Sequence, residues 1–182
     1  MTRLALFVLA LVLAPVAVFT AGAQTTAPPA TLKSVLLEQL RTTHNQKDWF
    51  VPPSLAVEGL TAEQASWKDA SGNHSIGQLT AHLVFWNQQV LSKLKGQTPA
   101  AYSGNNDETF NSFDAAKWAA TVKALDTVMS DLEQVLDSAD DQALAKMAST
   151  MAHVGTHNAY HTGQILFIRK QRGWWDPEKG VK

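Results

Sequence analysis

Hydrophobic residues recur at helical spacing along four stretches of the chain, and no stretch gives a convincing strand pattern. In the most regular stretch, six apolar residues are separated by 4, 3, 4, 3 and 4 positions: Trp118, Val122, Leu125, Met129, Leu132 and Leu136. A second regular stretch covers residues 76–94, and the others cover residues 31–47 and about 142–172. Four amphipathic helices joined by modest loops predict an all-α fold, a four-helix bundle with one longer crossover.

Capping residues indicate where the helices begin. Ser75 and Gln78 have the spacing of a capping box at the start of the second helix. Thr61 and Gln64 have the same spacing and predict a short extra helical turn. Asp114 stands in the right place to cap the third helix.

Proline and glycine indicate where the helices stop. Pro52-Pro53 interrupts the pattern after the first helix, because proline removes a backbone donor and disfavours helix just before it. Residues 54–59 then add a helical turn. Residues 97–113 form a loop rich in Asn, Asp and Ser, and Gly173 ends the last helix.

The amino-terminal segment has the pattern of a secretory signal peptide. A basic residue precedes an apolar run at 4–19, and Ala23 ends an Ala-x-Ala cleavage site. The run contains a proline and is shorter than the ~20 residues of a membrane span, so an uncleaved anchor is the alternative reading. We predict residues 1–23 as signal peptide, 24–30 as linker and 31–182 as one domain, exported to the periplasm or the extracellular space.

Composition narrows the chemistry. The full chain has a formal net charge of −1, and removal of the signal peptide makes it one unit more negative. This balance gives no electrostatic support for a nucleic-acid partner. The chain has no cysteine, which excludes disulfides, a thiolate nucleophile and any cysteine-ligated metal. Metal ligands must therefore be His, Asp or Glu.

Three of the six histidines lie four residues apart in the last helix. His153, His157 and His161 share one helical face, and neighbours at this spacing can reach one metal ion. His82 flanks the apolar seam of the second helix and is the natural third ligand. The alternative for each residue is a hydrogen-bonded histidine of the core. Spacing alone leaves open which pair in the last helix binds the metal.

His44 and His74 have simpler interpretations. His44 falls near the end of the first helix and is interpreted as the end of its amphipathic face. His74 precedes the cap of the second helix and is interpreted as a packing residue at that position.

Two motifs together resemble the DinB/YfiT-like family. The first is Ser75-Ile-Gly-Gln-Leu-Thr-Ala-His82-Leu-Val-Phe-Trp86-Asn87, and the second is His157-Asn-Ala-Tyr-His161-Thr-Gly163-Gln164. The resemblance covers about residues 31–175, and Asn106-Asp107-Glu108-Thr109-Phe110 looks like a landmark of one branch. It implies a DinB-like four-helix bundle with one metal-binding histidine in the second helix and two in the last.

Carried over residue by residue, the family's ligands fall on His82, His157 and His161. The resemblance implies a divalent ion, zinc or nickel, and places His153 one turn too early, as a supporting or cavity residue. Gln164 is then placed to orient a ligand or water. Gly163 is interpreted as a site of close helix packing.

The resemblance implies a metal-dependent hydrolase that acts on a small molecule through metal-bound water. The alternatives are a non-catalytic metal- or small-ligand-binding protein and a thiol-dependent transferase, whose thiols are cytoplasmic. Activity as an enzyme stays open, because no general base is evident. Four carboxylates in loops are interpreted as caps or surface charges: Asp48, Asp107, Glu108 and Asp114.

Aromatic residues at helical spacing are usually core, so we interpret Trp86 and Tyr160 as core residues rather than as pocket walls. Trp174-Trp175 is interpreted as a cap on the end of the bundle, with a homodimer contact as the alternative. No membrane partner is expected once the signal peptide is removed.

Overall fold

All four main helices predicted from the pattern are present in the computed structural model, which describes residues 29–181. The α-helices are α1 (Leu32–Thr42), α2 (Pro53–Val57), α3 (Ala62–Ser66), α4 (Ile76–Leu94), α5 (Trp118–Ser138) and α6 (Asp141–Gln171). Three short 3-10 helices accompany them: η1 (Asn106–Phe110), η2 (Ala115–Lys117) and η3 (Pro177–Lys179). Residues 29–181 contain no strand, so the all-α prediction is confirmed. The predicted signal peptide and most of the linker lie outside the described residues.

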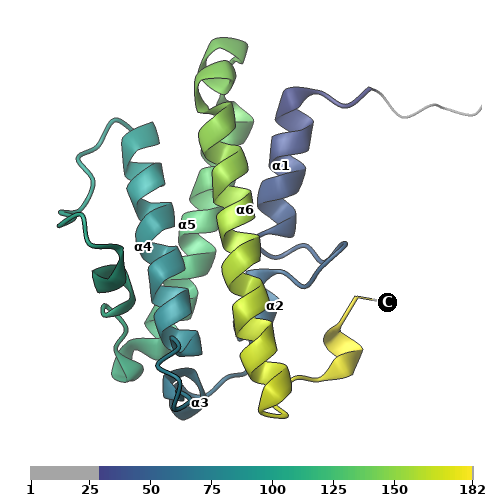
Figure 1. The fold of residues 1–182 in the computed structure, drawn as a ribbon. Helices are drawn as coiled ribbons and strands as arrows, with labels where there is room; N and C mark the ends of the chain where they lie inside the picture. The colour runs from purple at the N-terminus through teal and green to yellow at the C-terminus, as the bar shows by residue number, and fades with distance from the viewer. Residues whose placement is uncertain (1–28, 182) are drawn as a thin grey trace, which may run out of the picture.

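The long helices form a four-membered bundle. Helix α1 packs against α5 and α6, and α4 packs against the same two helices from the other side. Figure 1 shows α4 and α5 running in the same direction, joined by a crossover that returns along the length of α4. This is the longer crossover that the sequence predicts, and η1 lies within it, against α4.

The predicted caps form as the sequence indicates. The Ser75 hydroxyl accepts from the Gln78 backbone N–H at 3.2 Å, and the Gln78 side chain accepts from the Ser75 N–H at 3.1 Å. Thr61 and Gln64 make the same reciprocal pair at the start of α3. Asp114 caps η2 rather than α5, because one turn of 3-10 helix precedes the α-helix.

Helix α1 ends at Thr42, five residues before the predicted end at residue 47. The chain leaves the helix here because His44 turns inward and is buried, with only 2% of its surface exposed. The backbone of Ser54 then donates to the His44 carbonyl at 3.1 Å and holds the turn against α2.

The apolar seam of α5 faces the core, as predicted: five of its six residues are buried, and Val122 is half-buried. Trp174 and Trp175 are half-buried against the cluster of core residues near the start of α4. The buried guanidinium of Arg169 fixes this tail, since it donates to the carbonyls of Trp174 and Ala56. These contacts support the interpretation of the Trp pair as a cap.

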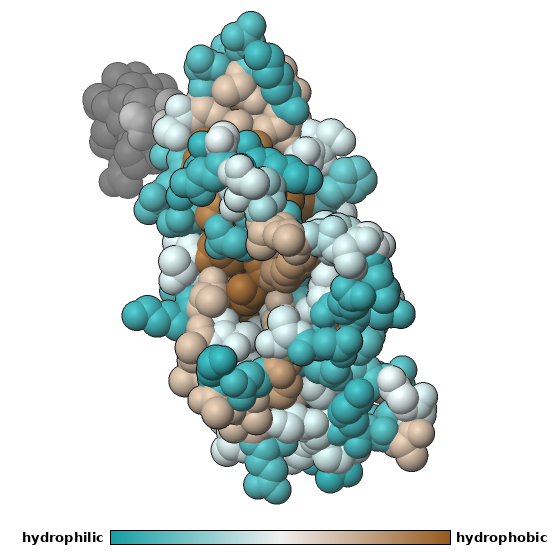
Figure 2. All heavy atoms as spheres, turned by 90° about the vertical axis from the view of Figure 1, so that its left-hand side faces the viewer, coloured by the Kyte–Doolittle hydropathy of each residue, from teal (hydrophilic) through white to brown (hydrophobic). Residues whose placement is uncertain are grey.

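The face of α4 and the crossover is hollowed. Figure 2 shows hydrophobic residues gathered in this hollow, with hydrophilic residues around it. A cavity of about 380 Å³ lies between α4 and α5, with Ala81, Val84 and Phe85 on one side and Ala120 and Ala124 on the other. Among the described residues, no helix is long and apolar enough to span a membrane.

Candidate metal centre

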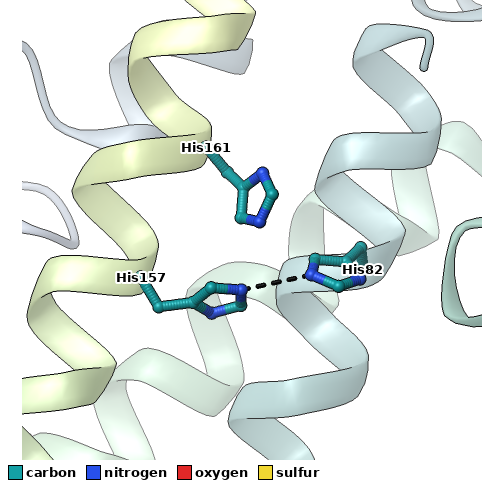
Figure 3. A group of neighbouring side chains, drawn as sticks. All are labelled: His82, His157 and His161. Carbon is teal, nitrogen blue, oxygen red and sulfur yellow. Dashed lines mark hydrogen bonds between the residues drawn. The ribbon is translucent and has the colours of Figure 1, made fainter. Parts of the chain in front are cut away.

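His82, His157 and His161 point toward one another across the interface of α4 and α6 (Figure 3). One ring nitrogen from each lies within 4.8 Å of the other two. His82 and His161 are buried, at 2% and 6% exposure, and His157 is half-buried. His157 and His161 are one turn apart on α6, so both rings reach the same point opposite His82.

Thr109 fixes the tautomer of His82. Its Oγ1 lies 2.5 Å from Nδ1 of His82 and donates its own hydrogen to the Asn106 carbonyl at 2.6 Å. Because that hydrogen is already used, the hydroxyl accepts from His82, and Nδ1 carries the proton. The lone pair of His82 is therefore on Nε2, the nitrogen nearest His157.

Gln164 fixes the tautomer of His161 in the same way. Its Oε1 lies 2.6 Å from Nδ1 of His161, and an amide oxygen can only accept. Nδ1 therefore carries the proton, and the Nε2 lone pair is left for the centre. The Gln164 NH₂ group is directed to the Tyr160 hydroxyl at 3.5 Å, which agrees with this orientation of the amide. Histidines that bind metals commonly hold the second ring nitrogen in this way.

The spacing of two ring nitrogens is suited to a small cation. Nε2 of His82 and Nε2 of His157 are 3.1 Å apart. In the metal-free protein His157 donates the hydrogen of this contact, since Nε2 of His82 has only a lone pair. Two nitrogens bound to one tetrahedral zinc are separated by about 3.3 Å, given Zn–N distances near ~2.0–2.1 Å. Neutral imidazoles are ligands for several divalent transition metals.

The environment keeps these rings uncharged near neutral pH. Burial, and to a lesser extent the imidazoles of His161, His157 and His74, lowers the pKa of His82 from 6.5 to about 3. Burial and the neighbouring His161 lower the pKa of His157 to about 4. Burial also lowers the pKa of His161, against the raising effect of its bond to Gln164. Neutral rings offer lone pairs to a metal without first losing a proton.

A cavity of about 740 Å³ opens in front of the three rings. Trp86 and Tyr160 line it, so their interpretation as core residues is wrong. Periodicity places an aromatic side chain on a face but does not show whether a neighbour covers that face. Among the described residues that line the cavity, Asp107 is the single carboxylate and none is lysine or arginine.

Phe110 forms the floor of this cavity together with two histidines. Its ring stacks on His82 at a centroid distance of 3.9 Å and on His74, from the other side, at 3.7 Å. His74 also lines the cavity, so it does more than pack before the helix cap. Burial and the charge of Lys68 lower the pKa of His74, and the carboxylate of Asp107 raises it.

The other two histidines lie outside the triad. His153 is exposed and lines the cavity, in agreement with its predicted place as a cavity residue. His44 is buried elsewhere, where Nδ1 lies 2.6 Å from Glu133 and Nε2 lies 2.9 Å from Asp126. His44 is thus a structural residue that joins the end of α1 to α5.

Sequence reasoning missed Thr109 and Phe110 as site residues. Both belong to η1, on the crossover. No periodic hydrophobic pattern in this segment predicts that they pack against α4. The one available signal was the stretch 106–110, which carries the resemblance to one branch of the family but assigns no role to either residue.

Gly163 follows His161 on α6 and does not serve close helix packing. Apart from the adjoining residues and the nearby backbone of α6 itself, no atom lies within 4 Å of the position that a Cβ at residue 163 would occupy. The interpretation of this glycine as a helix-packing site is therefore wrong. At Gly155, by contrast, an added Cβ would lie 3.6 Å from the Cβ of Gln39 on α1.

Comparison with known proteins identifies the family of the chain. No curated protein and no solved structure gives a significant match to the chain. The model of the DinB superfamily matches residues 54–165, a segment that holds α4, η1, α5 and all three rings of the triad. More than half of the chain lies within this match, and the chain therefore belongs to the DinB superfamily.

Proposed function

We propose that the protein binds one divalent metal ion, zinc or nickel, through His82, His157 and His161. One observation carries the proposal: one ring nitrogen from each of three imidazoles converges on the same point, and hydrogen bonds to Thr109 and Gln164 set the orientation of two of the rings. Without a metal, the Nε2 atoms of His82 and His157 share one hydrogen, and the other tautomer of His157 lets both nitrogens bind a metal ion.

We further propose that the site hydrolyses a small-molecule substrate. A divalent ion on three histidines supplies Lewis acidity and a water of lowered pKa, with at least one coordination position left open. The cavity in front of the rings gives room for a substrate, and Asp107 on its wall is the carboxylate available to take up a proton. Gln164, which already orients His161, lines the same cavity and can orient the substrate.

The lining of the cavity favours the hydrolase over a thiol-dependent transferase. Low-molecular-weight thiol cofactors that carry carboxylate or phosphate groups are usually bound by lysine or arginine. No lysine or arginine is among the described residues that line the cavity. The second candidate function is non-catalytic binding of a metal or small ligand. A hydrolase needs a carboxylate such as Asp107 to take up a proton, whereas a binding protein does not.

Export to the periplasm or the extracellular space is part of the proposal. Its support is the amino-terminal sequence, with a basic start, an apolar run and an Ala-x-Ala site. A homodimer through Trp174 and Trp175 has less support, because both side chains pack on their own bundle.

The metal content of the purified protein tests the proposal directly. We expect one zinc or nickel ion per chain, measured by elemental analysis and native mass spectrometry after dialysis against the metal. His82→Ala and His157→Ala each lose this ion, whereas His153→Ala keeps it because His153 lies outside the triad. Equal metal content in the parent and in both triad variants would show that these residues are not the ligands.

A further inference from the structure

A second cavity adjoins the metal centre along α6. It has a volume of about 380 Å³ and shares His74, Tyr160 and Gln164 with the cavity in front of the triad. Its remaining walls come from α6, from the segment between α3 and α4, and from the first turn of α4. They are Trp67, Asp69, Asn73, Leu79, Gly163, Phe167, Ile168 and Gln171. A molecule at the triad therefore has space to extend past Gln164 into the second cavity.

Gly163 keeps this second cavity open. It lies inside α6, where glycine is the least favourable residue after proline. Its φ is not positive, and no neighbour approaches the position of a Cβ within 4 Å. Neither backbone conformation nor packing requires a glycine here. A larger side chain at this position would project into the cavity, so the glycine provides space over the helix.

The walls of the second cavity are chiefly aromatic and apolar. Phe167 is 67% exposed and Tyr160 is 64% exposed, which leaves large apolar surfaces facing the opening. Trp67 also lines the cavity. Asp69 is the only charged group among the described lining residues, and no lysine or arginine balances an anion there. The cavity thus suits an uncharged apolar group and disfavours an anionic one.

We propose that the substrate carries an uncharged apolar group, of the size of an aromatic ring, that binds over Gly163 against Trp67 and Phe167 while its reacting group lies at the triad. The position of the reacting group rests on the proposed metal-dependent function. The apolar subsite itself rests on the second cavity and on Gly163.

Two hydroxamates with the same metal-binding group test the subsite in the zinc-loaded protein. Acetohydroxamate reaches only the metal, and 4-phenylbutyrohydroxamate adds a phenyl group on a short chain. We expect the phenyl compound to bind at least tenfold more tightly in calorimetry, and succinic acid monohydroxamate to lose this gain. In Gly163→Leu the leucine fills the cavity, and the affinity ratio of the first two compounds falls to about one.

Ala152→Leu is the matched control, since it adds a leucine to an exposed position of α6 that lines neither cavity. We expect it to keep the tenfold ratio. A ratio near one in the parent protein, or a tenfold ratio that persists in Gly163→Leu, would overturn the proposal.

A metal-free measurement separates failure of the subsite from failure of the metal site. The neutral amide 4-phenylbutyramide is titrated into the protein without metal and followed by the NMR signals of backbone amides. We expect shifts at Gly163 and Phe167 that Gly163→Leu abolishes. If these shifts occur but hydroxamate binding does not depend on zinc, the proposed metal-dependent function is wrong and the apolar subsite is supported. Shifts confined to other parts of the molecule would refute the subsite.

Discussion

Thr109 lies 27 positions from His82 in the chain, yet its Oγ1 is 2.5 Å from Nδ1 of that imidazole. The contact joins the crossover to α4 at the histidine triad. Since the same hydroxyl donates to the Asn106 carbonyl, it can only accept from the histidine. Thr109 therefore holds both the tautomer and the plane of His82.

Replacing Thr109 with valine should weaken metal binding by about 10- to 100-fold, the usual effect of losing such a supporting contact. Valine has nearly the same shape as threonine but cannot accept a hydrogen bond. Competition with a fluorescent zinc chelator measures the affinity. Thr109→Ser keeps the hydroxyl and should stay close to the parent. Equal affinities in Thr109→Val and the parent would remove Thr109 from the site.

Acid should destabilise the metal-free protein through the triad. The pKa of His82 is about 3 and that of His157 is about 4 in the folded protein, against 6.5 when unfolded. Below pH 6.5 the unfolded chain therefore binds protons that the folded chain does not. The free energy of unfolding is highest above pH 6.5 and falls as the pH drops toward these lowered values.

His157→Asn tests this origin of the pH dependence. The variant lacks one of the two groups, so its unfolding free energy should depend less steeply on pH between 6.5 and 4.5. The reduction in slope corresponds to the uptake of up to one proton fewer per molecule on unfolding. Urea unfolding of metal-free protein at several pH values measures the slope. Parallel curves for parent and variant would show that His157 does not have a lowered pKa.

His44 should stabilise the fold without affecting the metal. Both ring nitrogens of this buried residue contact carboxylates, at 2.6 Å and 2.9 Å. His44→Phe keeps the ring volume but removes both hydrogen bonds. We expect the free energy of unfolding to fall by roughly 1–3 kcal/mol. Solvent screens the contact with Asp126, because that side chain is exposed, so this contact contributes the smaller part.

Zinc stoichiometry in His44→Phe should stay at one per chain, which distinguishes this histidine from the triad. His153→Phe is the control for the substitution itself, because His153 is exposed. Loss of zinc from folded His44→Phe would mean that the two histidine sites are coupled.

The sequence predicted the long helices, apart from the end of α1, and, with the family resemblance, the three histidines that converge. Helices α4, α5 and α6 carry long regular periods, and capping boxes act over three residues, so local patterns define them. His157 and His161 share a face by spacing alone. The choice of that pair over His153 needed the family resemblance, because all three histidines fall on the same stripe.

Contacts made across the crossover could not be predicted from local patterns. Thr109 and Phe110 meet His82 only because η1 folds back on α4, and nothing in their neighbourhood indicates that packing. The burial of His44 has the same cause, since its partners Glu133 and Asp126 lie on α5. Side-chain pairing between distant segments depends on how the helices assemble.

Asp107→Asn should separate a hydrolase from a metal-binding protein. If the carboxylate takes up a proton in the reaction, the rate of metal-dependent hydrolysis should fall by about 10²- to 10⁴-fold. Zinc affinity should stay within threefold, since Asp107 is not among the converging ligands. The rate with 4-nitrophenyl acetate, with and without zinc, measures the first effect, and Glu108→Gln provides a neighbouring control. An unchanged rate would exclude Asp107 as the base.

Gly163 inside α6 and Gly173 just beyond its end should respond to alanine in opposite directions. Gly163→Ala should raise the free energy of unfolding by up to ~1 kcal/mol, because the helix interior favours alanine and nothing obstructs the new methyl group. Gly173 has a φ of 70°, just beyond the helix, where alanine is strained. Gly173→Ala should therefore lower the free energy of unfolding by about 1 kcal/mol. Urea denaturation of both variants measures the difference. A stability loss in Gly163→Ala would indicate a packing role for this glycine and would contradict an open space over α6.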